Sequence, residues 1–218
     1  DGNVKAFVVE KQADGSYPEG YRPEVIKGKI GKRAILQADI VIENLHVPEE
    51  NRLKNCESFA GVNRVLAATR GGASWESVGH AMAGFEFAAK YALEREQFSA
   101  PIASYQLVQE KLATMLGHVT EAQLLCTRMA ELQERDEMDG PRASLIKMVT
   151  ARKGLAVTRE ARDMLGGNGL LLNNKVARHV TDMEVISTYE GTDSVQALIV
   201  GREITGISAF TRKVRPKN

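Results

Sequence analysis

Apolar and polar residues follow two different patterns along the chain, and the pattern changes near residue 62. Before this point, runs rich in β-branched and aromatic residues predict three strands, at residues 4–9, 25–30 and 34–42. A polar stretch with several glycines and prolines, residues 12–23, predicts a loop. Three strands without a second sheet bury too little to be stable alone. We therefore expect them to be the later part of a larger β-domain.

After residue 62, apolar residues recur at the spacing of an α-helix and predict five helices. The helices begin near residues 62, 108, 141, 175 and 192, and the third ends at a glycine pair. The apolar stripes expected to face the core are Trp75, Val78, Met82, Phe85, Ala89 and Ala92 in the first helix, Val108, Leu112, Met115, Val119, Cys126, Met129 and Leu132 in the second, Leu145, Met148 and Leu155 in the third, and Val195, Leu198, Ile199 and Ile207 in the fifth. Short loops between long helices imply antiparallel neighbours.

The predicted fold is therefore mainly α, with a C-terminal up-down helical bundle preceded by part of an antiparallel β-domain. We place the β-part at residues 1–55, the bundle at residues 56–210 and a basic tail at residues 211–218. The chain begins at Asp1, without an initiator Met or a signal-peptide pattern. We interpret it as the later part of a longer polypeptide.

Composition and charge narrow the class of function. The 218 residues are 43% hydrophobic and 6% aromatic, which suits helices packed with Ala, Leu, Val and Met. The net charge of +1 does not favour nucleic acid or an anionic membrane, and no apolar run approaches the roughly 20 residues that span a bilayer. Cys56 and Cys126 form no C-x-x-C motif, which indicates a reduced, intracellular protein. The four histidines lack metal-ligand spacing, so no metal site is predicted.

The sharpest candidate for chemistry is Glu190, in the segment Tyr189-Glu190-Gly191-Thr192. Gly191 leaves room for a ligand to approach the backbone, and Thr192 can cap the helix that follows. A carboxylate at such a turn is well placed to take a proton from a substrate that excludes water. The alternative is an ordinary acid before a helix cap, paired with an arginine. This motif alone leaves both interpretations open.

A glycine-rich segment, Asp-Met-Leu-Gly-Gly-Asn-Gly at residues 163–169, follows the third predicted helix. It is not a Rossmann nucleotide loop, because it follows a helix rather than a strand and lacks the G-x-G-x-x-G pattern. We interpret it as a helix C-cap with left-handed residues. Its backbone amides could also face a phosphate or a ribityl group.

Charged and aromatic residues at the end of the first predicted helix, residues 94–98, suggest a ligand as well. Arg95 either complements the helix dipole or grips a pyrophosphate with its planar guanidinium. Phe98 and Gln106 could stack on and hydrogen-bond to an adenosine. Arg70, early in the same helix, opposes the helix dipole, so we expect it to have an acidic partner or an anionic ligand.

Taken together, the motifs at residues 95–98, 163–169 and 189–192 resemble, in order and spacing, the signatures of the acyl-CoA dehydrogenase family. The resemblance covers nearly the whole chain, from the second half of the family's middle β-domain to the end of its C-terminal bundle. Residues 161–169 and 201–210 are most similar to the glutaryl-CoA dehydrogenase branch. The short-chain acyl-CoA oxidases share much of that pattern.

This resemblance implies FAD as cofactor and an acyl-CoA thioester as substrate. By resemblance, Glu190 removes the α-proton while the β-hydrogen leaves as hydride to the flavin, and Thr69, Arg70 and Gly191 bind the substrate. The implied cofactor-binding residues are Arg95, Gln97, Phe98, Gln106, Asp163, Met164, Leu165, Gly166, Gly167, Thr192, Asp193 and Phe210. Arg95, Gln106 and residues 163–167 correspond to positions that hold the FAD of a neighbouring subunit.

The resemblance also implies a homotetramer, a dimer of dimers, with an electron-transfer flavoprotein as electron acceptor. The expected compartment is the cytoplasm of a bacterium or the mitochondrial matrix of a eukaryote. Two alternatives remain open: a short-chain acyl-CoA oxidase of the same fold, and a non-catalytic helical oligomerisation fragment. Ser99 stands where the family usually has glycine, and Asp163 replaces the glutamine that many members carry. The family's N-terminal helical domain has no counterpart here, so acyl specificity and decarboxylation cannot be read from this chain.

Overall fold

The computed structural model describes residues 4–209. The chain divides into two compact units, Asp1–Leu66 and Ala67–Asn218. The dividing point lies within the long helix α1 (Phe59–Glu94). The domain boundary expected at residues 55–56 remains a prediction.

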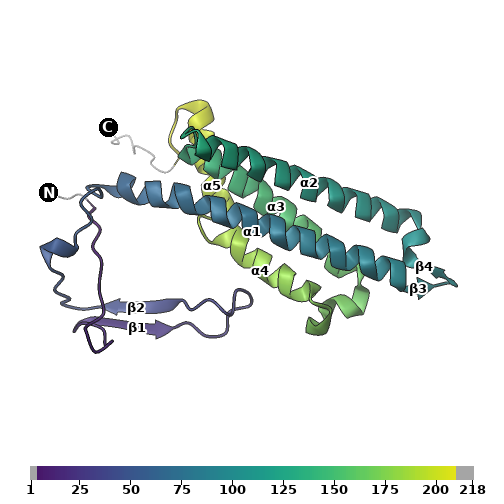
Figure 1. Ribbon diagram of the computed structural model, residues 1–218, viewed down its shortest axis with the longest axis horizontal. Helices are drawn as coiled ribbons and strands as arrows, with labels where there is room; N and C mark the ends of the chain where they lie inside the picture. Colours follow the sequence, from purple (N-terminus) through teal and green to yellow (C-terminus); the bar gives the residue numbers. More distant parts are fainter. Residues whose placement is uncertain (1–3, 210–218) are drawn as a thin grey trace, which may run out of the picture. The chain divides into compact units, whose positions relative to one another are not determined.

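The first unit contains one antiparallel strand pair. Strand β1 (Tyr21–Val25) pairs with β2 (Ala38–Ile42) (Figure 1). In this pairing Tyr21 lies opposite Ile42, and Val25 lies opposite Ala38. A short 3-10 helix, η1 (Glu49–Asn51), follows.

Only one of the three expected strands is confirmed, in part, because β2 covers the second half of residues 34–42. The strand expected at residues 4–9 is wrong, since that segment makes a single bridge from Phe7 to Arg52. The strand expected at residues 25–30 is also wrong, because β1 ends where it should begin and starts inside the expected loop. All residues of β2 are exposed. Because the strand has no buried face, apolar and polar residues need not alternate along it, and a prediction from sequence depends on that alternation.

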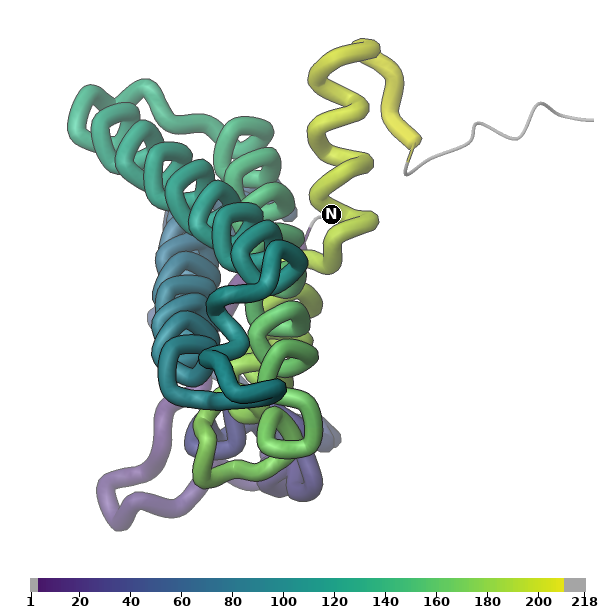
Figure 2. The backbone as a smooth tube through the Cα atoms, turned by 90° about the vertical axis from the view of Figure 1, so that its right-hand side faces the viewer, coloured from purple at the N-terminus to yellow at the C-terminus, as the bar shows by residue number. Residues whose placement is uncertain are grey.

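The second unit is a helical bundle, as predicted. After α1 come α2 (Gln106–Glu134), α3 (Gly140–Met164), α4 (Val176–Thr188) and α5 (Asp193–Thr205). The first four alternate in direction, and α5 stands to one side of them (Figures 1 and 2). Helix α3 is central, because it packs against α2, α4 and α5. The predicted up-down bundle is therefore confirmed.

The buried face of α1 consists of small residues, not the large ones that the sequence pattern favoured. Its buried residues are Arg70, Gly71, Ala73, Ser74, Ser77, Val78, Ala81, Gly84, Ala88 and Ala92. Trp75 and Met82, expected in the core, are exposed in this chain, as is Leu145 on α3. Small side chains let helices approach closely, so a stripe of Ala, Gly and Ser marks the core here better than a stripe of large residues.

The stripe expected on α2 is confirmed at its centre. Met115, Val119, Cys126 and Met129 are buried. Met115 and Val119 join Ala81 of α1, Val157 of α3 and other apolar residues in one cluster, whereas Ile207 lies beyond the end of α5 and is exposed.

The connections carry the local geometry that positions the candidate residues. Strands β3 (Glu96–Gln97) and β4 (Ala100–Pro101) form a hairpin after α1, and Phe98 and Ser99 at its tip have φ angles of 52° and 65°. Two successive left-handed residues make a type I′ turn, which glycine occupies with less strain than serine. The 3-10 helices η2 (Ile102–Ser104), η3 (Gly166–Leu170) and η4 (Leu172–Asn174) complete the chain path.

Close packing around Gly154 of α3 gives a test of this arrangement. A Cβ atom at Gly154 would lie 2.6 Å from Met183 Cε and 3.2 Å from the Ser77 carbonyl oxygen. We expect Gly154→Leu to lower the free energy of unfolding by about 1–3 kcal/mol or more, through overpacking. Chemical denaturation measures this, with Gly117→Leu on the open face of α2 as the control. Equal stability of the two variants would contradict the close approach of α1, α3 and α4.

Candidate functional site

The turn between α4 and α5 has an unusual backbone. Glu190 has a φ of 56° and Gly191 a φ of 96°, so both lie in the left-handed region. For a non-glycine residue this conformation costs free energy, and such residues gather at functional sites. Thr192 caps α5, accepting a hydrogen bond from the Val195 amide at 3.4 Å, as the sequence predicted.

The Glu190 carboxylate is half-buried, and Arg70 and Lys147 are positive charges near it. Its Oε2 accepts a hydrogen bond from the Thr69 hydroxyl at 2.6 Å. Arg70 donates instead to the Glu190 backbone carbonyl, from Nε at 3.3 Å. Among the described residues, no lysine, arginine or histidine forms an ion pair with this carboxylate. The pairing that would have made Glu190 an ordinary surface acid is therefore not present in the described part of the chain.

The Arg70 side chain is buried, with 5% of the residue's surface exposed. Burial lowers the pKa of its guanidinium, and attraction to Glu190 acts in the opposite direction. The expectation that Arg70 has an acidic neighbour is thus met by Glu190, although the contact is to the backbone oxygen.

Glycine is favoured at position 191 by the φ of 96°, and a side chain from α5 fills the adjacent space. A Cβ atom on Gly191 would lie 2.4 Å from Gln196 Nε2. That amide donates to the carbonyl oxygens of Glu190, at 2.7 Å, and of Gly191, at 3.1 Å. Gln196 is fully buried and was not among the residues singled out from the sequence.

A second residue missed by the sequence analysis is Lys147 of α3, which is fully buried. Its ammonium group donates to the carbonyl oxygens of Gly191, at 2.8 Å, and of Ser187, at 3.2 Å. Burial lowers its pKa to about 8, against attraction from Asp193. Its sequence context, an apolar residue on either side, was the available signal, but a lysine on an apolar stretch can also reach the surface with its head group.

Tyr189 and Glu76 form another pair beside Glu190. The Tyr189 hydroxyl donates to a Glu76 carboxylate oxygen. Burial raises the pKa of the phenol, and the hydrogen bond to Glu76 raises it further. The pair links α1 to the end of α4, so Glu190 is preceded by a residue that is itself anchored.

A separate cavity of about 410 Å³ lies near the other end of α4. It brings together the ends of α1 and α3 and the β3–β4 hairpin. The predicted residues that line it are Arg95, Gln97, Asp163, Met164, Leu165, Gly166 and Gly167, together with Tyr91, Ile102, Asn168 and Leu171. The sequence analysis thus identified most of this wall.

The charges on the cavity wall are unequally compensated. Lys111 bonds to Asp163 at 3.0 Å, and this hydrogen bond holds the pKa of the Asp163 carboxyl below its usual range. Arg95, in contrast, forms no side-chain hydrogen bond or ion pair within the described part of the chain. Its guanidinium is therefore available to an anion. Gly166 has a φ of 56° at the end of α3, as expected for a left-handed cap.

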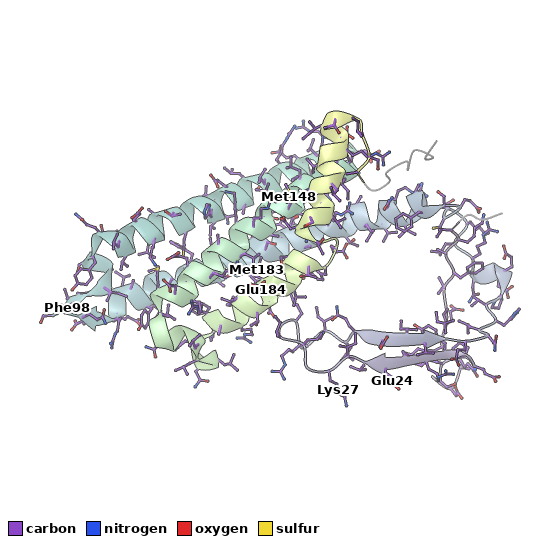
Figure 3. All side chains as sticks on the ribbon, turned by 180° about the vertical axis from the view of Figure 1, so that it is seen from behind. Glu24, Lys27, Phe98, Met148, Met183 and Glu184 are labelled. Carbon is purple, nitrogen blue, oxygen red and sulfur yellow. The ribbon has the colours of Figure 1, made fainter. Side chains whose placement is uncertain are left out.

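Other predicted residues lie outside this cavity. Phe98 is 91% exposed at the tip of the hairpin, at the end of the bundle (Figure 3). Gln106 is exposed at the first position of α2. Asp193 forms two hydrogen bonds with Arg152, at 2.7 and 2.8 Å. Phe210 lies outside the described residues.

The cavity and Glu190 are separated by the length of α4. This helix has 13 residues, which corresponds to about 20 Å at 1.5 Å per residue. The two groups of predicted residues therefore form two separate places on one chain. Within residues 4–209, no three His, Cys, Asp or Glu side chains are grouped to hold a metal ion, and every helix is too short or too polar to cross a bilayer.

Comparison with known proteins identifies the family of the chain. Residues 59–205 match the family described as "Acyl-CoA dehydrogenase, C-terminal domain". An acyl-CoA dehydrogenase of Bacillus subtilis is 31% identical over 204 residues, which cover 93% of this chain and 52% of that protein. Subunit CarC of the caffeyl-CoA reductase–Etf complex of Acetobacterium woodii is 30% identical over 198 residues, which cover 90% of this chain and 51% of CarC.

Solved structures give the same result. Two crystal structures of glutaryl-CoA dehydrogenase from Mycobacterium smegmatis, one of them in complex with FADH2, superpose with a TM-score of 0.91. They are 32% and 29% identical to this chain and cover 97% of it, and the chain covers 53% of each. The chain thus spans about half the length of the proteins it matches. The family match and the helical fold together establish that this chain belongs to the acyl-CoA dehydrogenase family.

Proposed function

We propose that this chain is the C-terminal part of an FAD-dependent acyl-CoA dehydrogenase in which Glu190 removes the α-proton of an acyl-CoA thioester. The observation that carries the proposal is the Glu190 carboxylate. It lies on a left-handed turn, accepts one hydrogen bond from Thr69 and pairs with no cation among the described residues. A base needs a free oxygen with a lone pair to take a proton, and this arrangement leaves one.

Each neighbour of the base has a distinct task in this proposal. Thr69 holds one carboxylate oxygen and so orients the other. Gly191, whose φ of 96° shapes the turn, would lie against the thioester, and Thr192, which caps α5, would contact the flavin. Arg70 supplies a positive charge near the substrate. When bound, FAD supplies an electron-poor ring that accepts the β-hydrogen as hydride.

The cavity at the end of α3 fits the phosphate part of such a dinucleotide. Arg95 is an uncompensated guanidinium on its wall, and Gly166 and Gly167 present backbone without side chains. A guanidinium and exposed amides are suited to a pyrophosphate. Because this cavity is about 20 Å from the base by the length of α4, we propose that it holds the FAD of a neighbouring subunit. Phe98, Gln106 and Asp193 remain proposed flavin contacts.

A homo-oligomer follows from this division, and we propose a homotetramer. The similarity to glutaryl-CoA dehydrogenase favours a short-chain or dicarboxylic acyl-CoA as substrate. The similarity to an Etf-complex subunit favours an electron-transfer flavoprotein as redox partner. The proposed compartment is the cytoplasm of a bacterium or the mitochondrial matrix of a eukaryote.

Removing the charge of the proposed base gives the direct test. We expect Glu190→Gln to lower turnover of acyl-CoA by about 10²–10⁴-fold, because an amide cannot accept the α-proton. Steady-state turnover with an artificial electron acceptor measures it, and the flavin absorbance of the purified protein should remain. Glu184→Gln, which alters a carboxylate of α4 that pairs with Arg159 of α3, is the matched control. Unchanged turnover in Glu190→Gln would end the assignment of the base.

The cavity is tested separately, through cofactor affinity. We expect Arg95→Ala to weaken FAD binding by about tenfold or more, because a charge-assisted hydrogen bond to the pyrophosphate is lost. Titration of the flavin-free protein, followed by flavin fluorescence, measures the dissociation constant. Arg128→Ala removes an arginine of α2 that pairs with Glu131 and should leave the affinity unchanged. Equal FAD affinity in wild type and Arg95→Ala would show that the cavity does not hold the phosphates.

A further inference from the structure

Among the described residues, Arg70 and Lys147 are the buried charged side chains, and the proposed chemistry does not use Lys147. Lys147 is fully buried, and both of its hydrogen bonds go to backbone carbonyls that flank the proposed base. We propose that Lys147 is a positioning residue that holds the α4–α5 turn and thereby aims the Glu190 carboxylate. The inference rests on the proposed role of Glu190.

Hydrogen bonds from several helices hold the α4–α5 turn, and we call this set of contacts the clamp. The Gly191 carbonyl oxygen accepts from Lys147 at 2.8 Å and from Gln196 at 3.1 Å. The Glu190 carbonyl oxygen accepts from Gln196 at 2.7 Å and from Arg70 at 3.3 Å. Donors from α1, α3 and α5 therefore converge on two successive carbonyls. Glu190 cannot relax from its positive φ without rotating these carbonyls away from their donors.

Lys147 adds a contact that the other donors do not make. Its ammonium also bonds the Ser187 carbonyl at 3.2 Å, in the last turn of α4. It therefore ties the end of α4 to the turn that follows, across Glu190. Because a helix leaves its last carbonyls without intrahelical partners, a cation there satisfies an acceptor as well as fixing an angle.

The free-energy cost of burying the Lys147 ammonium distinguishes a positioning role from a role in packing alone. Burying an ammonium is costly unless it is paired, and within the described part of the chain no carboxylate lies within ion-pair distance of Lys147. A methionine of similar size would fill the same space without that cost. What lysine provides and methionine does not are the two hydrogen bonds to the Ser187 and Gly191 carbonyl oxygens. Replacement by methionine should therefore disturb the turn more than it disturbs folding.

The same burial predicts how stability depends on pH. The pKa of Lys147 is lowered to about 8 in the folded chain from its ordinary 10.5, and the charged groups facing it are Asp193, Arg70 and Glu190. Between these values the unfolded chain keeps the proton and the folded chain has lost it, so the free energy of unfolding rises with pH across this window. The difference between wild type and Lys147→Met, measured by chemical denaturation from pH 7 to 10.5, should rise accordingly. This difference tests the burial of the ammonium, and the variants compared next decide its positioning role.

The decisive experiment compares Lys147→Met with Lys153→Met in the flavin-containing protein. Lys153 lies on the same helix but pairs with Glu121, away from the turn. We expect Lys147→Met to lower kcat by about 100-fold with little change in KM and with flavin retained, as for a misplaced catalytic group. Lys153→Met should keep the wild-type kcat. A wild-type kcat in Lys147→Met would overturn the proposal.

Backbone amide hydrogen exchange at the end of α4, where the Tyr189 amide donates to the Val185 carbonyl oxygen at 2.9 Å, gives a second readout that does not need activity. Exchange there should be faster in Lys147→Met than in wild type, and the neutral donor in Lys147→Gln should restore part of the protection and part of kcat. Unchanged exchange in Lys147→Met would overturn the clamp. If wild type turns over no acyl-CoA, the proposed function fails instead. Exchange then decides the clamp alone, with faster exchange supporting it and unchanged exchange overturning it.

Discussion

The geometry of the candidate base depends on three buried side chains that hold two backbone carbonyls. Arg70, Lys147 and Gln196 come from different helices, and all donate to the carbonyl oxygen of Glu190 or Gly191. A left-handed glutamate is strained, so its conformation persists only where the surroundings over-determine it. These three donors fix the backbone conformation of Glu190, and the position of its carboxylate depends on that conformation.

The bundle makes this convergence possible through small residues. Glycine, alanine and serine cover the buried face of α1, and Gly154 of α3 meets Met183 and Ser77 closely. Helices packed at short range bring side chains from separate elements to one turn without long, flexible reaches. The large apolar residues that such packing leaves outside, Trp75 and Met82 among them, are exposed in this chain.

The cavity at the ends of α1 and α3 differs from the turn of Glu190 in how its charges are paired. At the cavity the compensated charge is the Lys111–Asp163 pair, and Arg95 is left for a ligand. The base lies beyond the far end of α4, so the proposed phosphate site and the carboxylate are two separate places on one chain. An assembly in which each chain completes its neighbour's site reconciles the two, and for this reason the proposed function includes an oligomer.

The local sequence determined the helices, the ends of several helices and the short motifs of the candidate site. Helical periodicity predicted the five helices, and the centre of α2, with Met115 and Met129, faces the core as expected. The left-handed Gly166 and the capping Thr192 follow from residue types at helix ends. Glu190 and most of the cavity wall were found because they form short contiguous motifs. What only the tertiary structure decided are the contacts between distant segments: the burial of Lys147, the amide of Gln196 against Gly191, and the exposure of Trp75. Whether a lysine or a tryptophan is buried depends on which helix lies against it, and the order of residues within one helix carries no record of that neighbour.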